Sequence, residues 1–166
     1  MNLKNIFMRY LEGNEIAIAN SSFLLCKQEA IKSPCLRAKS GSVIVKSGVL
    51  IGRGFNGPPN GITLERCLKD ELPKDFKSDN TCCVHAEQRA IINALRNNPL
   101  DLLGSRLYFL RLDLDNQMQF AGKPYCTICS KLALDVGIKE FVLWHKDGIA
   151  VYDTQEYNEL SFAFRR

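Results

Sequence analysis

Two short motifs combine residue types that bind metal ions. His85 and Glu87 are separated by one residue, and the segment CTIC places two cysteines at Cys126 and Cys129. Both motifs lie at the start of a predicted helix, where cysteines at i and i+3 share a face and can reach one ion. One histidine and two cysteines leave the fourth position of a tetrahedral zinc ion open for water, which is typical of a catalytic site.

The glutamate beside the histidine adds a proton carrier to this set. Zinc-bound water with a pKa near 7 lies almost 9 units below bulk water, a difference of about 12 kcal/mol. Because two thiolates neutralise much of the charge on zinc, the metal alone is a weaker acid here. We therefore expect attack by a zinc-bound hydroxide, with Glu87 moving protons from water to a ring nitrogen and then to departing ammonia.

Each motif alone is weak evidence, since paired cysteines are common and a histidine at a helix start often has a merely polar role. The chain has two histidines, which narrows the choice of ligand. The other one, His145, follows the apolar run FVLW and is expected at a strand end or on the surface. The two motifs together favour a catalytic zinc on His85, Cys126 and Cys129.

The elements that position these residues follow from hydrophobic periodicity and turn signals. A helix is predicted over residues 14–33, and a hairpin over 42–56 with its turn at Ser47-Gly48. A polar, charged excursion follows, up to Asn80, long enough to be a candidate for function. The remaining predicted elements, alternately helix and strand, cover residues 82–98, 105–114, 126–136, 138–145 and 153–162.

This order predicts an α/β protein with a three-layer α-β-α fold. The strand–helix alternation favours a mixed, mostly parallel sheet with helices on both faces. A length of 166 residues fits a single domain over 1–166. No apolar run approaches the ~18 residues that span a bilayer, and charged residues interrupt the first twenty positions. We therefore expect a cytoplasmic protein with no membrane partner.

Charge says little about the substrate. The net charge of +4 is mild and spread along the chain, whereas a duplex-binding face is usually more basic. An anionic small molecule would need only one or two cationic side chains. Nucleic acid is therefore not the expected partner.

At this point the chain resembles the cytidine and deoxycytidylate deaminase superfamily, whose signature is His-x-Glu followed by Pro-Cys-x-x-Cys. The resemblance covers about residues 34–144, and GSVIVKSGVLIGRGFNGPPNG and HAEQRAII are similar to the deoxycytidylate branch. It implies the cytidine-deaminase-like fold, zinc on His85, Cys126 and Cys129, and Glu87 as the proton shuttle. The implied enzyme is a zinc-dependent hydrolase that acts on an amidine C–N bond.

The same resemblance implies residues that bind the substrate. Asn56 would contact the sugar or the base, although Asn-Gly is also a common turn dipeptide. The backbone of Ala86 would help to hold the ring. Where the family usually has proline directly before the first cysteine, this chain inserts Tyr125 after Pro124. Tyr125 could stack on the base or pack under the helix.

Four more cysteines surround the first motif: Cys35, Cys67, Cys82 and Cys83. Relatives in the deoxycytidylate branch carry extra cysteines here, and some of these hold a second, structural zinc. A metal would anchor the excursion, which has few apolar residues of its own. Adjacent cysteines diverge, however, and so the alternative is that all four are reduced thiols without a metal.

The leading hypothesis is hydrolytic deamination of a cytosine-containing nucleotide, with deoxycytidylate converted to deoxyuridylate. The alternatives are deamination of another base, such as guanine or adenine in transfer RNA, and a non-catalytic zinc-binding module. The expected partner is a small-molecule nucleotide. The resemblance also implies a homo-oligomer, because relatives often share active-site edges between subunits.

Overall fold

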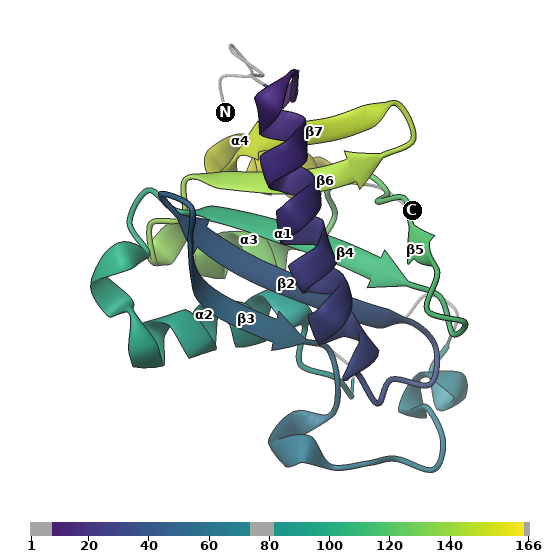
Figure 1. The fold of residues 1–166 in the computed structure, drawn as a ribbon. Coiled ribbons are helices and arrows are strands. Elements are labelled where there is room, and N and C mark those ends of the chain that lie inside the picture. Colours follow the sequence, from purple (N-terminus) through teal and green to yellow (C-terminus); the bar gives the residue numbers. More distant parts are fainter. Residues whose placement is uncertain (1–7, 74–81, 165–166) are drawn as a thin grey trace.

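The computed structural model describes residues 8–73 and 82–164, and its centre is a seven-stranded sheet (Figure 1). The strands follow the order β1-β7-β6-β4-β2-β3, and β5 pairs with β4 beside this path. Their bounds are β1 Arg9–Tyr10, β2 Lys39–Lys46, β3 Val49–Phe55, β4 Arg106–Leu112, β5 Met118–Gln119, β6 Glu140–His145 and β7 Gly148–Asp153.

Helices cover both faces of this sheet. The helix α1 (Asn14–Ile31) crosses one face, and α2 (Ala86–Asn97), α3 (Thr127–Asp135) and α4 (Thr154–Ala163) lie on the other (Figure 1). The predicted three-layer α/β architecture is therefore confirmed. None of the helices in the described part of the chain has both the length and the apolar character that crossing a membrane requires.

The central strands supply both cores because their side chains alternate between the two faces. Val43 and Tyr108 pack beneath α1, and their neighbours Ile44 and Leu107 pack beneath α2 and α3. All four side chains are almost completely buried. A strand segment covered on both faces is apolar in consecutive positions, as residues 43–45 of β2 and 107–110 of β4 show.

The expectation that most strands run parallel is wrong. Among the described strands, β4 and β6 form the one parallel pair, and the other pairings are antiparallel. The crossover through α3 makes β4 and β6 parallel, but a two-residue turn at Lys146 and Asp147 then reverses the chain into β7. The sequence pattern predicts no strand at residues 148–153, and it does not indicate the short strands β1 and β5.

The other predicted elements are present. The hairpin of β2 and β3 turns at Ser47 and Gly48, whose φ angles of 49° and 80° are typical of a tight hairpin turn. The helix α1 ends at Ile31, close to its expected end. The excursion contains two short 3-10 helices, η1 (Pro59–Gly61) and η2 (Leu68–Glu71), and residues 74–80 of it lie outside the described residues.

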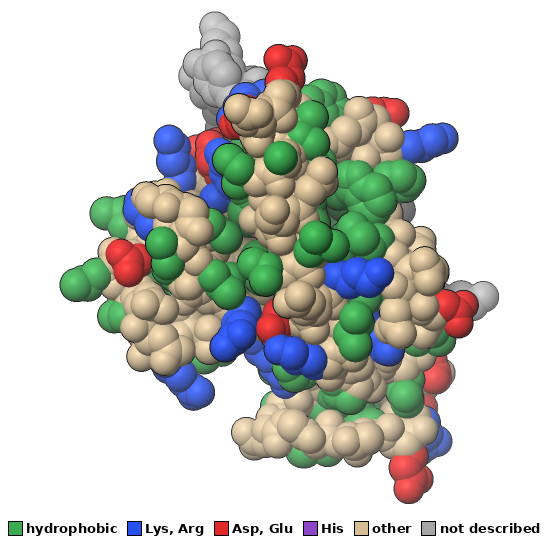
Figure 2. Space-filling model, in the orientation of Figure 1, with side chains coloured by type: hydrophobic (Ala, Val, Ile, Leu, Met, Phe, Trp, Pro, Cys, Tyr) green, Lys and Arg blue, Asp and Glu red, His purple; other side chains and the backbone are tan. Residues whose placement is uncertain are grey.

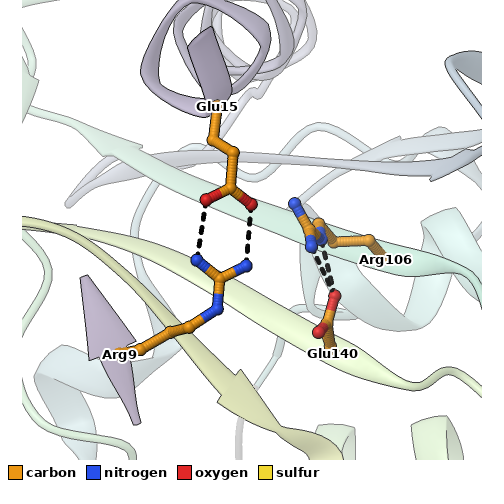
Figure 3. Close-up of polar contacts among 4 residues, drawn as sticks. All are labelled: Arg9, Glu15, Arg106 and Glu140. Atoms are coloured by element: carbon orange, nitrogen blue, oxygen red, sulfur yellow. Dashed lines mark hydrogen bonds and ion pairs between the residues drawn. The ribbon is translucent and has the colours of Figure 1, made fainter. Parts of the chain in front are cut away.

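Two arginine–carboxylate pairs lie near one another, one between β1 and α1 and the other between β4 and β6 (Figure 3). Arg9 of β1 donates two hydrogen bonds, of 2.7 and 2.8 Å, to Glu15 in the first turn of α1. Nearby, Arg106 of β4 bonds Glu140, its neighbour across the parallel strand pair. The Arg9 guanidinium lowers the pKa of Glu15, and Arg106 adds a smaller effect in the same direction.

Candidate metal centre and active site

The N-termini of α2 and α3 carry the predicted ligands. His85 and Cys126 each occupy the position just before a helix begins. The carbonyl of His85 accepts the Arg89 amide at 3.1 Å, and that of Cys126 accepts the Ser130 amide at 3.1 Å. These bonds close the first turn of each helix, so regular backbone structure fixes both ligand positions.

A glycine brings α2 close to the sheet. A Cβ atom at Gly54 of β3 would lie 2.5 Å from the Ala90 nitrogen and 2.6 Å from the Ala86 oxygen. Any larger residue would push the helix outward. Gly54 therefore sets the depth at which the N-terminus of α2, with His85 and Glu87, enters the molecule.

The three predicted ligand atoms form a compact triangle. His85 Nδ1 lies 3.3 Å from the Sγ atoms of both Cys126 and Cys129, and these two sulfurs are 3.4 Å apart. Tetrahedral zinc with ordinary bond lengths would separate its ligands by about 3.6–3.8 Å. The triangle is thus within a few tenths of an ångström of a zinc site, and these residues could hold a zinc ion.

Hydrogen bonding between the two cysteines favours the thiolate of Cys126 and raises the pKa of Cys129 well above its ordinary value. The hydrogen bond from Cys129, followed by that from His85, lowers the pKa of Cys126 to about 4. The pKa of His85 is raised, chiefly by its hydrogen bond with Cys126. The site therefore already stabilises one thiolate, which is the form that binds zinc.

Glu87 is buried beside this triangle. It stands in the first turn of α2, and its side chain is only 6% exposed. Burial raises the pKa of Glu87 to about 7, and the nearby charge of His85 opposes that rise. A carboxyl group with a pKa near neutrality can both accept and return a proton at physiological pH.

A cavity of about 280 Å³ opens onto His85 and Glu87. Its apolar wall includes the rings of Phe109, Phe120 and Tyr125. The cavity is also lined by three cationic side chains, Arg37, Lys69 and Arg111. A flat ring and an anionic group could therefore both find complementary surfaces in it.

Asn56 lines the cavity, but its side chain is also bonded to the chain itself. Its Oδ1 atom lies 2.7 Å from the Ser40 amide nitrogen, and its Nδ2 donates to the Ala38 carbonyl at 2.9 Å. Arg89 of α2 donates to the carbonyl oxygens of Phe55, Gly57 and Pro58 and so fixes the segment around Asn56.

The two other predicted substrate contacts also line the cavity. Ala86 is fully buried as the first residue of α2. Tyr125 is 51% exposed, and its ring lies 5.8 Å from that of Phe164, beyond the end of α4. The ring of Tyr125 thus has one face toward the C-terminal segment as well as a place in the cavity wall.

The four additional cysteines gather on the same cavity: Cys35, Cys67, Cys82 and Cys83. The Sγ atoms of Cys82 and Cys83 are 3.7 Å apart. Within the described residues, however, His85, Cys126 and Cys129 form the one group of three or more ligand atoms that lie within 4.8 Å of one another. The second zinc site stays a prediction.

Sequence reasoning missed two features of the cavity. Arg111 is exposed between the buried residues Leu110 and Leu112 of β4, and a lone arginine in an apolar strand could have signalled it. The segment 120–122 also lines the cavity, and nothing in its sequence indicates this role. His145 does end β6, as expected, but both of its ring nitrogens have partners.

Comparisons with known proteins agree with this geometry. The family model of the cytidine and deoxycytidylate deaminase zinc-binding region matches residues 18–145. A deoxycytidylate deaminase of Mycobacterium phage D29 is 36% identical over 68% of this chain and 83% of its own length. One from Saccharomyces cerevisiae is 30% identical over 68% of this chain, which spans only 33% of that relative.

Solved structures share the fold. A dCMP deaminase from the cyanophage S-TIM5 is 24% identical, with a TM-score of 0.54 over 75% of this chain and 80% of that one. A cytidine deaminase from Burkholderia pseudomallei is 15% identical, with a TM-score of 0.54 over 83% and 94% of the two chains. The predicted fold class, zinc cofactor and class of enzyme are confirmed. The chain belongs to the family defined by the cytidine and deoxycytidylate deaminase zinc-binding region.

Proposed function

We propose that this chain hydrolyses the amino group of a cytosine-containing nucleotide, converting deoxycytidylate to deoxyuridylate. One observation carries the proposal: Glu87 is buried beside the triangle of His85, Cys126 and Cys129, and a cavity opens onto His85 and Glu87. A structural zinc site has no use for such a carboxylate. The relatives named as deoxycytidylate deaminases support the choice of substrate.

His85, Cys126 and Cys129 would hold the zinc ion, which when bound supplies Lewis-acid activation of a water molecule. Glu87 takes one proton from the attacking water and places it on the ring nitrogen beside the reacting carbon. Glu87 then takes the second proton from the new hydroxyl group and passes it to the amine, and the C–N bond breaks as the carbonyl forms. Water and the amidine thus become a carbonyl and ammonia, and Glu87 returns to its starting state.

The cavity wall offers the remaining contacts. We assign the Asn56 amide to the sugar or the base and the Ala86 backbone to the pyrimidine ring. Tyr125 would stack on the base from the exposed side of the cavity. All three residues line the cavity that opens onto Glu87.

A cationic wall favours a nucleotide over a nucleoside. Arg37 forms an ion pair with Asp70, so part of its positive charge is already neutralised within the chain. Arg111 is exposed and lines the same cavity. We assign Arg111, with help from Lys69, to the phosphate of the substrate, because arginine recognises phosphate through two parallel hydrogen bonds.

The same proposal covers the overall organisation of the molecule. We propose that residues 1–166 act as a single deaminase domain and that copies of it form a homo-oligomer. Ile18, Leu24 and Ile31 of α1 are each about half exposed. Figure 2 shows hydrophobic side chains at the surface over this helix. Exposed apolar side chains of this kind are common where subunits meet. Sedimentation equilibrium would measure the oligomeric state.

The decisive experiment is a screen for ammonia release from free bases, nucleosides, nucleotides and transfer RNA, with bound zinc quantified in the same preparations. We expect release from deoxycytidylate at low and at high salt. A transfer-RNA substrate would instead show activity that falls steeply with salt. A zinc-loaded protein that releases no ammonia from any compound would establish the alternative, a non-catalytic zinc module.

The variant Glu87→Ala separates catalysis from metal binding. It should keep its zinc and its fold and lose ammonia release by at least about 100-fold. All three ligands remain in this variant, and the backbone bonds that close the first turns of α2 and α3 do not involve the Glu87 side chain, so zinc should still bind. Unchanged activity in this variant would overturn the proposed mechanism.

A further inference from the structure

A short segment between β5 and α3 forms part of the cavity wall. Its residues Phe120, Ala121 and Gly122, here called the strap, all line the cavity that opens onto Glu87. The strap lies outside the regular elements, so its position depends on individual contacts. Those contacts converge on the end of β6.

Two of the contacts are made by Trp144. The amide of Ala121 donates to the Trp144 carbonyl at 2.8 Å. The rings of Phe120 and Trp144 are 4.4 Å apart between centroids, at 53° to each other. These contacts hold the start of the strap against the strand.

The third contact is made by His145. Its Nδ1 atom lies 3.1 Å from the Ala121 carbonyl oxygen, and its Nε2 atom lies 2.8 Å from the Tyr152 hydroxyl. Because a carbonyl oxygen can only accept, Nδ1 must carry a hydrogen and donate it to Ala121. The Tyr152 hydroxyl can donate or accept, so it can bond Nε2 and hold the imidazole ring in this orientation.

Tyr152 ties this histidine to the core. Its ring meets the ring of Tyr157 edge to face, with centroids 5.8 Å apart, and Tyr157 stacks on Phe141 at 4.1 Å. Phe141 is fully buried on the β6 strand. The path from strap to core therefore runs through His145 and Tyr152, and each link has a defined geometry.

We propose that His145 is a positioning residue that holds the strap at the depth required for the substrate base. The expected effect on KM rests on the proposed function. The expected effect on the position of the strap does not. Without the His145–Ala121 bond the strap would keep its Trp144 contacts and the packing of Ala121 against the core. A misplaced wall should weaken substrate binding more than it slows the chemical step at Glu87.

Two amide substitutions separate the two nitrogens of this histidine. In His145→Asn the amide nitrogen can occupy the place of Nδ1 and still donate to Ala121. In His145→Gln the amide reaches the place of Nε2, and the bond to Ala121 is lost. We expect His145→Gln to raise KM for deoxycytidylate roughly tenfold with kcat and zinc content nearly unchanged. His145→Asn should stay within about threefold of the wild type.

A second readout does not depend on catalysis. Trp144 is the single tryptophan in the chain, so its fluorescence reports on the strap that covers it. Acrylamide should quench Trp144 more strongly in His145→Gln than in the wild type, and His145→Asn should resemble the wild type. If the wild type deaminates nothing but this quenching difference appears, the proposed function fails and the positioning role stands.

The control is a variant that weakens the same hairpin without touching the strap. Val151 lies opposite Val142 across β6 and β7 and packs under α1. Val151→Ala should lower thermal stability and leave KM unchanged. If His145→Gln and His145→Asn behave alike in KM and in quenching, or if KM simply follows stability, His145 does not position the strap.

Discussion

The Ser33 hydroxyl lies 2.7 Å from the side-chain oxygen of Asn56, just after the end of α1. The same oxygen accepts the Ser40 amide, so the segment between α1 and β2 is fastened to the end of β3 through one side chain. Asn56 is thus a framework residue as well as a cavity residue. A substitution here should affect folding and substrate binding together.

Asn56→Ala should lower the free energy of unfolding by about 2 kcal/mol or more, because several polar partners lose their bonds at once. Ser33→Ala removes one donor and should cost about 1 kcal/mol. Urea unfolding of the zinc-loaded proteins measures both values. An Asn56→Ala protein as stable as the wild type, but with a raised KM, would show that Asn56 serves the substrate alone.

Arg111→Gln should raise KM for deoxycytidylate by about 10- to 100-fold, the effect of losing a charged hydrogen bond to phosphate. The rate with the corresponding nucleoside, which has no phosphate, should not change. Lys131→Gln is the matched control, because Lys131 is an exposed α3 residue outside the cavity and the charge change is the same. Equal losses with nucleotide and nucleoside would remove Arg111 from phosphate recognition.

Zinc content distinguishes the two groups of cysteines. We expect about one zinc per chain, lost in Cys126→Ser and in Cys129→Ser because each leaves the triangle with two strong ligands. Cys83→Ser, also in the cavity wall, should keep that zinc. Metal analysis after gel filtration gives the ratio. A ratio near two that falls to one in Cys83→Ser would instead establish the second, structural zinc.

The sequence predicts the elements around the metal because each has a strong local signal. The helices that begin after His85 and Cys126 are periodic and clearly bounded, and both are present. The sheet is harder to predict from the sequence, because the turn between two strands decides whether they pair parallel or antiparallel. Residues 148–153 follow a two-residue turn and pair with β6 as a hairpin, which the helix–strand alternation did not indicate.

The residues of the site also divide into those that a local motif indicates and those that only the tertiary structure brings together. Residues that share a motif, such as His85 and Glu87, could be found because the chemistry needs them a fixed number of residues apart. Arg111 and the strap reach the cavity through the pairing of β4 with β5 and the contacts at the end of β6. Such positions depend on tertiary structure, and no spacing in the chain indicates them.

The raised pKa of Glu87 should also be visible in the stability of the metal-free protein. Burial shifts this pKa from 4.5 to about 7 in the folded state. Between these values the folded protein retains a proton that the unfolded chain has released. Raising the pH therefore favours unfolding, and the group should cost about 3 kcal/mol of stability by pH 8 that is absent at pH 4.

Glu87→Gln isolates this contribution, because the amide keeps the shape of the protonated carboxyl group and does not titrate. The experiment is urea unfolding of chelator-treated wild type and Glu87→Gln at pH 5 and pH 8. The free energy of unfolding of the variant should rise relative to that of the wild type as the pH increases. The raised pKa of His85 acts in the same direction, and its largest cause, the hydrogen bond with Cys126, is present in both proteins and cancels in the difference. The smaller part that comes from the charge of Glu87 is lost in the variant and adds to the same trend. Parallel pH profiles for the two proteins would mean that Glu87 is already ionised when the metal is absent, and that the site stabilises its charge without zinc.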